Sequence, residues 1–383
     1  MAKPKVLFTF VEAGMGHIIP MNGIYKAFCK KYGEQCEAVK SYVFSESHSK
    51  EVREMGEALA AHTKRVANDN FYNFIEAVSY GFSSKTTLAI LDARFKKAIK
   101  AFSAELAKIC PDLIVSSYYL PSHIAAKTNE AGLTDTLIAT YSPDPYIYPA
   151  WDRDCDLFIV NNDNAEHMAL KKGFSEDSVK KIPFVYDEKI TDSKLTKDEA
   201  RKKTGIDDKF TVLFTNGAYG TKRTGRLLEK LVDANLGINL LAVCGNDKSM
   251  LDKVMCLKEK NSGTHIIATG FADNLHELML ASDLAVGKGG SNTIMESVYL
   301  GCPMIINAEA SRLETETAKY RESQGLVIRV KNPDRIIDFI KKCITDKSVL
   351  ENYKKRFKPF VQPDGAKICA DLLYSLLQKK FGL

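Results

Sequence analysis

The chain has 383 residues, of which 45% are hydrophobic, and its formal net charge is +6 at pH 7. This length exceeds the ~250–300 residues at which a single hydrophobic core stops growing, so we expect two domains. The modest positive charge is compatible with anionic ligands or an anionic membrane surface, but it is too small to indicate nucleic-acid binding. The nine cysteines include no C-x-x-C pair, and no apolar run approaches ~20 residues. We therefore expect a cytoplasmic protein with reduced thiols and no membrane-spanning segment.

Strand-like apolar runs alternate with helical patterns along most of the chain. The candidate strands are 6–10, 112–117, 136–141, 156–161, 211–215, 239–244, 265–271, 283–287, 303–307 and 326–330. Continuous apolar strands that alternate with helices are typical of parallel sheets covered on both faces. The pattern predicts an α/β protein with two Rossmann-like parallel-sheet domains. Their bounds are an N-terminal domain at 1–185, a C-terminal domain at 198–364, and a C-terminal helix within 365–383 that packs back on the N-terminal domain.

The first predicted strand runs into a glycine-containing loop, in the stretch VLFTFVEAGMGHIIPMNG. Gly14 and Gly16 let the backbone turn sharply and let a ligand approach the start of the next helix. A dinucleotide fingerprint would need a third glycine where Ile19 stands, so the loop is not a good NAD site. Glu12 and His17 are side chains suited to acid–base chemistry. The alternative is a tight turn with a histidine that only packs or caps the helix.

The region 46–102 is helical and has no strand signal. It contains the aromatic residues Phe71, Tyr72, Phe74, Tyr80 and Phe82, followed by the basic residues Arg94, Lys96, Lys97 and Lys100. Aromatic side chains beside cations are typical of a surface that binds an anionic membrane. The alternative is an ordinary aromatic core between buried helices.

Two further glycine loops follow predicted strands of the second half. One, FTNGAYGTKRTG, contains Gly217. The other follows the strand at 283–287 and opens a helix with the residues Lys288, Gly289, Gly290, Ser291, Asn292 and Thr293. The N–H groups of 290–293, the helix dipole and the charge of Lys288 suit a diphosphate, and Glu296 can accept hydrogen bonds from a sugar diol. Capping by Ser291 or Asn292 and a helix-dipole role for Glu296 are the alternatives.

These motifs carry a family resemblance over nearly the whole chain. GFADNLHELMLASDLAVGKGGSNTIMESVYLGCPMIIN resembles the donor-binding block of the GT-B glycosyltransferases, and EAGMGH resembles their acceptor-side loop, with Glu12 where Asp is usual. The similar group contains the monogalactosyl- and diglucosyl-diacylglycerol synthases and the MurG-like peptidoglycan GlcNAc transferase. The resemblance implies a GT-B fold, in which two Rossmann-like domains face a cleft.

The resemblance also implies roles for particular residues. Gly289, Gly290, Ser291 and Asn292 would hold the diphosphate of a UDP-sugar, Glu296 the ribose, and Phe271 would lie beside uracil. Glu314 matches a glutamate of the donor-sugar stretch, although Leu313 stands where that stretch has Gln. A Thr-Asp pair of the group appears as Thr140-Tyr141, with Asp144 displaced. No metal and no cofactor are expected.

The function expected from these features is inverting transfer of a hexose from a UDP-sugar to diacylglycerol or a related lipid acceptor. Glu12 or His17 would be the base, and the enzyme could attach peripherally to the inner face of the cell membrane. The alternatives are a soluble glycan or natural-product UDP-glycosyltransferase, a UDP-GlcNAc epimerase on the same fold, and a non-enzymatic UDP-sugar sensor.

Overall fold

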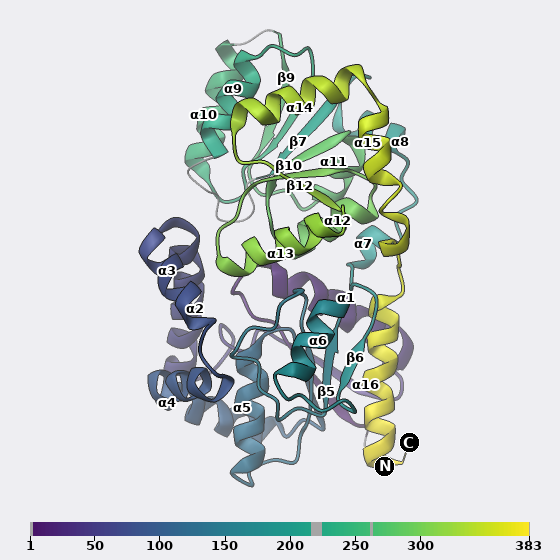
Figure 1. Ribbon diagram of the computed structural model, residues 1–383. Coiled ribbons are helices and arrows are strands. Elements are labelled where there is room, and N and C mark those ends of the chain that lie inside the picture. The colour runs from purple at the N-terminus through teal and green to yellow at the C-terminus, as the bar shows by residue number, and fades with distance from the viewer. Residues whose placement is uncertain (1–2, 216–223, 261–262, 383) are drawn as a thin grey trace. The chain divides into compact units, whose positions relative to one another are not determined.

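The computed structural model describes residues 3–215, 224–260 and 263–382, and the chain divides into two compact units. Unit 1 comprises Met1–Arg65, Phe74–Asp187 and Pro363–Leu383, and unit 2 comprises Val66–Asn73 and Glu188–Gln362. Each unit contains a six-stranded parallel sheet with helices against it (Figure 1). The predicted α/β class with two parallel-sheet domains is confirmed.

Up to Asp187, the chain alternates strands and helices around the first sheet. The elements are β1 (Lys5–Thr9), α1 (Met15–Tyr32), β2 (Glu37–Ser41), α2 (Lys50–Asn68), α3 (Asn70–Ser79), α4 (Ser84–Ile109), β3 (Leu113–Ser116), α5 (Tyr119–Glu130), β4 (Leu137–Tyr141), β5 (Leu157–Val160), α6 (Asp163–Lys171) and β6 (Val179–Lys181). The strand order is β2-β1-β3-β4-β5-β6. The order therefore reverses between β1 and β3, which is where doubly wound sheets bind their ligands.

Apolar side chains from both faces of this sheet meet different helices. On one face, strand residues pack with α1 and with α16 (Gly365–Phe381), which supplies Leu373 and Leu377. On the other face they pack with α2, α4 and α5. The C-terminal helix is thus part of the core of unit 1. At its first residue, Gly365, an added Cβ would lie 2.4 Å from the Phe184 carbonyl oxygen, so this close backbone approach requires glycine.

Unit 2 repeats the alternation around the second sheet. From Glu188 to Gln362 the elements are α7 (Glu188–Thr191), α8 (Lys197–Thr204), β7 (Thr211–Thr215), α9 (Thr224–Asp233), β8 (Asn239–Val243), α10 (Lys248–Lys260), β9 (His265–Thr269), α11 (Leu275–Ala281), β10 (Leu284–Lys288), α12 (Ser291–Tyr299), β11 (Met304–Ala308), α13 (Arg312–Ser323), β12 (Val327–Arg329), α14 (Pro333–Thr345), α15 (Ser348–Lys354) and a 3-10 turn at Lys358–Phe360. The strand order is β12-β11-β10-β7-β8-β9. This is the dinucleotide-fold order, and it reverses between β7 and β10.

The sequence analysis missed two strands, β2 and β6. Both lie at an edge of the first sheet, and their sequences, EAVKS and VKK, are short and carry charged residues. Edge strands pair on one side only and tolerate polar residues, so they lack the continuous apolar run that marks a central strand.

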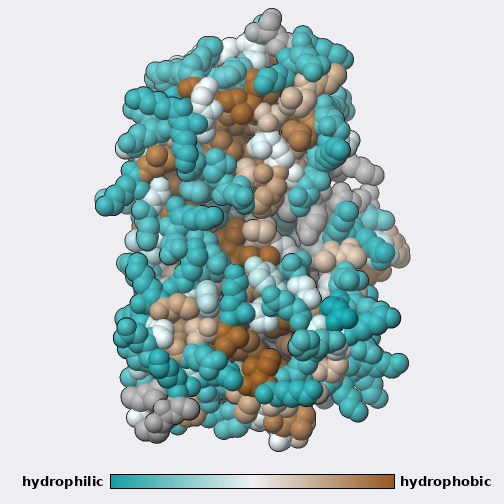
Figure 2. Space-filling model, turned by 180° about the vertical axis from the view of Figure 1, so that it is seen from behind, coloured by the Kyte–Doolittle hydropathy of each residue, from teal (hydrophilic) through white to brown (hydrophobic). Residues whose placement is uncertain are grey.

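The surface differs from the two cores in character. The face shown in Figure 2 carries mainly hydrophilic side chains, with hydrophobic ones in small separate patches. Across the part of the chain that the structure describes, each helix is too short or too polar to cross a lipid bilayer.

Candidate active site

His17 and Ser117 meet at the switch point of unit 1. His17 lies in the first turn of α1, directly after β1, and Ser117 follows β3. Because β1 and β3 are paired in parallel, with Thr9 opposite Ser116, the loops that follow them come together at one edge of the sheet. The His17 ring Nδ1 lies 2.7 Å from the Ser117 carbonyl oxygen, and the Ser117 hydroxyl donates to the His17 carbonyl oxygen at 2.7 Å.

This contact fixes the tautomer of His17. A carbonyl oxygen can only accept, so Nδ1 carries the proton and Nε2 of the neutral ring carries a lone pair. Burial lowers the pKa of His17 to about 4, and the hydrogen bond to Ser117 opposes part of that fall. The imidazole is therefore neutral at pH 7 and can accept a proton at Nε2, while the Ser117 carbonyl stabilises the charged ring that forms.

Glu12 differs from His17 in its setting. Its side chain is exposed in the turn before α1, and among the residues that the structure describes it makes no hydrogen bond or ion pair. Gly14 precedes the helix with φ 130°, a backbone conformation that favours glycine, whereas an added Cβ at Gly16 would meet open space. The loop thus holds His17 in place but leaves Glu12 without a fixing partner.

The switch point of unit 2 carries the predicted diphosphate loop. Gly287, on β10, pairs with Thr215 of β7, and an added Cβ would lie 2.4 Å from the Thr215 carbonyl oxygen. The pairing of β10 with β11 shifts register between Gly287 and Lys288, a bulge of the kind that redirects a side chain. The predicted residue Gly217 follows β7 in the sequence and lies outside the described residues.

Lys288 and Glu314 form an ion pair that the sequence analysis did not anticipate. Lys288 Nζ lies 2.7 Å from Glu314 Oε1, with each side chain 19% exposed. Glu314 Oε2 also accepts the Ala310 backbone N–H at 2.6 Å, and the Ser311 hydroxyl caps α13 by accepting the Glu314 N–H. The sequence analysis assigned Lys288 to the phosphates and Glu314 to the sugar as separate contacts. The structure instead joins them, so each orients the other.

The start of α12 carries the residues of the predicted phosphate site. Gly290 occupies the N-cap position, and its own N–H donates to the Lys288 carbonyl oxygen at 2.9 Å, so its role in holding a phosphate stays a prediction. Ser291, Asn292 and Thr293 form the first turn of α12, where N–H groups point along the helix axis. Gly289 packs closely, since an added Cβ would lie 3.2 Å from the Ile306 side chain.

The two residues predicted to contact the nucleoside lie on different elements of unit 2. Glu296 lies in the second turn of α12 and is 7% exposed. Phe271 follows β9 and is 49% exposed. The two residues are thus a buried carboxylate and a half-exposed ring, and their contact with a nucleoside stays a prediction.

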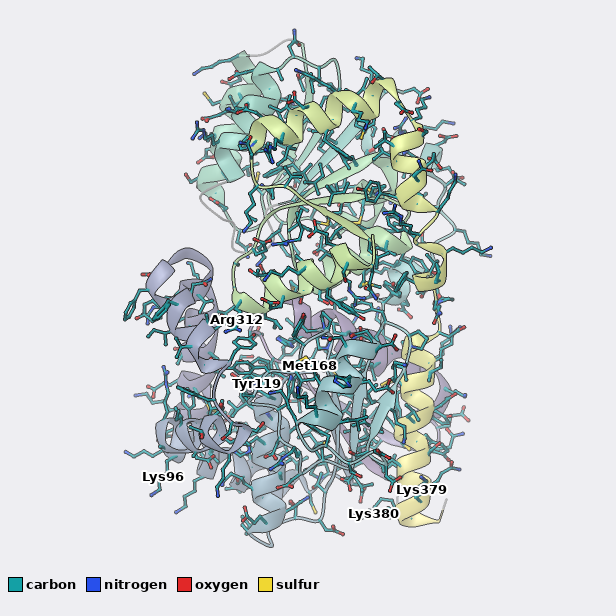
Figure 3. All side chains as sticks on the ribbon, viewed as in Figure 1. Lys96, Tyr119, Met168, Arg312, Lys379 and Lys380 are labelled. Carbon is teal, nitrogen blue, oxygen red and sulfur yellow. The ribbon has the colours of Figure 1, made fainter. Side chains whose placement is uncertain are left out.

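The helix α3 presents apolar side chains outward. Phe71, Phe74, Ile75 and Val78 of α3, and Phe82 after it, are 41–66% exposed, so the alternative of a buried aromatic core is wrong for these three phenylalanines. Tyr80 is less exposed than these residues, and its ring packs on Tyr148 with the two centroids 5.0 Å apart. The cations of α4 are exposed, and Lys96 projects away from the helix in Figure 3.

The sequence analysis overlooked Ser117, Tyr118 and Tyr119. The signal was present, because SSYYL directly follows a predicted strand and polar side chains at the carboxyl ends of parallel strands form the ligand edge of such sheets. Ser117 and Tyr118 contact His17, and Tyr119 follows them in the sequence, so we assign all three to the same candidate site.

Two parallel α/β units, each with a loop at the switch point of its sheet, define the GT-B fold. The glycosyltransferase family 28 C-terminal domain matches residues 211–367, and this chain is a GT-B glycosyltransferase. Acinetobacter baumannii MurG has the same fold, with a TM-score of 0.64 and 12% identity over 97% of this chain and 100% of that chain. UDP-GlcNAc 2-epimerase from Neisseria meningitidis, bound to UDP-GlcNAc, shares it with a TM-score of 0.59 and 14% identity over 99% and 100%.

Two relatives indicate the nearer group. The chloroplastic monogalactosyldiacylglycerol synthase of Spinacia oleracea is 25% identical, covering 98% of this chain and 73% of its own length. The processive diacylglycerol beta-glucosyltransferase of Bacillus subtilis (strain 168) is 22% identical, covering 92% of this chain and 90% of its own length. The resemblance to the diacylglycerol glycosyltransferases is confirmed.

Proposed function

We propose that this protein transfers a hexose from a UDP-sugar to the hydroxyl of diacylglycerol or a related lipid, with inversion at the sugar carbon. The observation that carries the proposal is the His17–Ser117 contact at the switch point of unit 1. The similarity to enzymes named for diacylglycerol supports the acceptor class.

In this proposal His17 is the general base. Nε2 removes the proton from the acceptor hydroxyl as its oxygen attacks the anomeric carbon, and the bond from that carbon to the UDP oxygen breaks. The positive end of α12 and the Lys288–Glu314 pair would lie at the diphosphate, and the helix dipole would stabilise its growing charge. These groups supply the stabilisation that a metal ion would otherwise give, so we propose a reaction that needs no metal.

The proposed function is tested by a screen of donors and acceptors. Purified protein is incubated with labelled UDP-glucose, UDP-galactose or UDP-GlcNAc and with diacylglycerol in mixed micelles, and lipids are extracted and analysed. We expect labelled glycolipid with a β-linkage, formed equally well in EDTA. Label that stays in the aqueous phase on a glycan or small molecule would favour the alternative acceptor class, and a rate that collapses in EDTA and returns with manganese would overturn the metal-independent mechanism.

Donor binding depends on Glu296 in this proposal. We predict that Glu296→Ala weakens UDP binding by ~1–3 kcal/mol, the scale of lost charge-assisted hydrogen bonds. Calorimetry measures the affinity for UDP. Glu296→Gln keeps the side-chain volume of this buried position, so its UDP affinity should lie between those of the wild type and Glu296→Ala. A thermal melt checks that each variant folds, and an unchanged UDP affinity in a folded Glu296→Ala would remove Glu296 from the site.

We also propose that the exposed apolar face of α3 and the cations of α4 bind an anionic membrane surface. Each basic residue near such a surface contributes ~1 kcal/mol, and the effect falls off within a Debye length. Changing Lys96, Lys97 and Lys100 to Glu should therefore reduce cosedimentation with phosphatidylglycerol vesicles at low salt, with UDP affinity unchanged.

The matched control for this membrane prediction carries the same three charge reversals in unit 2, at the exposed residues Lys342, Lys347 and Lys355. This variant should bind the vesicles as the wild type does. If both triple variants bind equally, the attraction comes from total charge and α4 is not the docking surface.

A further inference from the structure

Tyr118 and Tyr119 continue the chain from Ser117, and Tyr118 places a phenol ring beside the His17 imidazole. The Tyr118 ring lies edge-on to His17, with centroids 4.8 Å apart and planes at 80°. Tyr119, the first residue of α5, packs against Tyr118 at 4.3 Å. The site beside the imidazole is therefore aromatic and carries hydroxyl groups.

Tyr119 is held by an apolar cluster underneath it. The centroid of its ring lies 6.2 Å from that of Trp151 and 5.7 Å from that of Tyr148. Met168 of α6 packs on the same cluster. Figure 3 labels Tyr119 and Met168, which come from α5 and α6. These contacts on several sides fix the ring, while the residue as a whole remains partly exposed.

The hydroxyl of Tyr119 accepts one hydrogen bond, and its own proton remains able to donate another. The Tyr118 hydroxyl donates to the Tyr119 oxygen at 3.0 Å. A phenol has a single proton, and for that of Tyr119 no acceptor lies within hydrogen-bond distance among the residues described. Burial raises the pKa of Tyr119, so the group stays protonated and remains a donor.

This donor complements the lone pair of His17. A lipid acceptor with a glycerol backbone presents the reacting hydroxyl, which donates to Nε2, and an oxygen on the neighbouring carbon, which can only accept when it is an ester. A simple long-chain alcohol presents the hydroxyl alone. A base and a separate donor, linked through the Tyr118 side chain that contacts both, therefore suit an acceptor with a vicinal oxygen.

We propose that Tyr119 is a specificity-determining residue whose hydroxyl donates a hydrogen bond to the oxygen vicinal to the reacting hydroxyl of the acceptor. Tyr118 is a positioning residue, because its own proton occupies the Tyr119 oxygen and directs the Tyr119 proton elsewhere. This inference rests on the proposed transfer to a glycerol-based lipid.

The test compares diacylglycerol with a long-chain 1-alkanol in the same mixed micelles. Loss of one neutral hydrogen bond corresponds to about a 3- to 10-fold change. In Tyr119→Phe we expect the KM for diacylglycerol to rise by about that factor, with the KM for the UDP-sugar and the kcat/KM for the alkanol unchanged. The matched control is Tyr374→Phe on α16, whose ring stacks on Tyr32 away from this site, and it should change neither acceptor.

The outcomes separate the two proposals. If wild type transfers to neither lipid, the proposed function fails and the specificity role fails with it. If wild type prefers diacylglycerol and Tyr119→Phe keeps the full preference, the role of Tyr119 is wrong while the proposed function stands. A loss of activity toward both acceptors alike would mark Tyr119 as structural and would also overturn its role in specificity.

Discussion

His17→Ala should lower the rate of sugar transfer by ~10²–10⁴-fold, the usual effect of losing a general base. The affinity for UDP should stay nearly intact, because His17 belongs to unit 1 and the predicted donor residues to unit 2. Steady-state kinetics and calorimetry on the same preparation measure the two quantities. The rate should fall because the neutral His17 ring accepts the proton at Nε2. Alanine removes this ring, which the Ser117 carbonyl oxygen orients through Nδ1.

Glu12→Ala is the matched control for this result. Glu12 lies on the same loop but has an exposed carboxylate, so its removal should change the rate by a few-fold at most. The pH profile gives a second check. Because burial lowers the pKa of His17 to about 4, its basic form persists well below pH 6.5, and kcat/KM should fall only as the pH approaches 4. A large loss in Glu12→Ala with near-normal turnover in His17→Ala would assign the base to Glu12.

Leu373→Ala should destabilise unit 1 by about 2–5 kcal/mol. Leu373 is fully buried on α16, where it packs with α1 and the central strands. Removing such a side chain loses the transfer free energy of its methyl groups and leaves a cavity. The single tryptophan of the chain, Trp151, is buried in unit 1, so its fluorescence during urea unfolding reports on this unit.

The control makes the same change at Leu133, which is 54% exposed. Leu133→Ala should shift the free energy of unfolding by less than about 0.5 kcal/mol. Equal midpoints for the two variants would mean that α16 contributes little to the core of unit 1.

The central strands could be predicted because their physical cause is local. Stretches such as TVLFT at Thr211–Thr215 are buried on both faces, so each residue of the run must be apolar or small. The edge strands β2 and β6 lack that constraint and were missed. The switch-point loops after β1 and β10 were found because glycines mark sharp turns in the sequence itself.

Pairings between distant side chains could not be predicted in the same way. Lys288 and Glu314 meet only because β10 and α13 are brought together by the sheet, and nothing in either local sequence signals the contact. Ser117 reaches His17 because β1 and β3 are neighbours, which depends on strand order. Strand order comes from the packing of the whole unit, so a single sequence read segment by segment does not reveal it.

The return of α16 to unit 1 has a consequence for biosynthesis. The ribosome makes all of unit 2 before it makes α16, so the first unit begun is the last one finished. Until then, Met21, Ile24 and Phe28 of α1 lack the helix that covers them in the native protein. Emerging chains with such uncovered surface are prone to aggregate and are served by chaperones. A chain cut short before Gly365 would lack the helix that completes the core of unit 1.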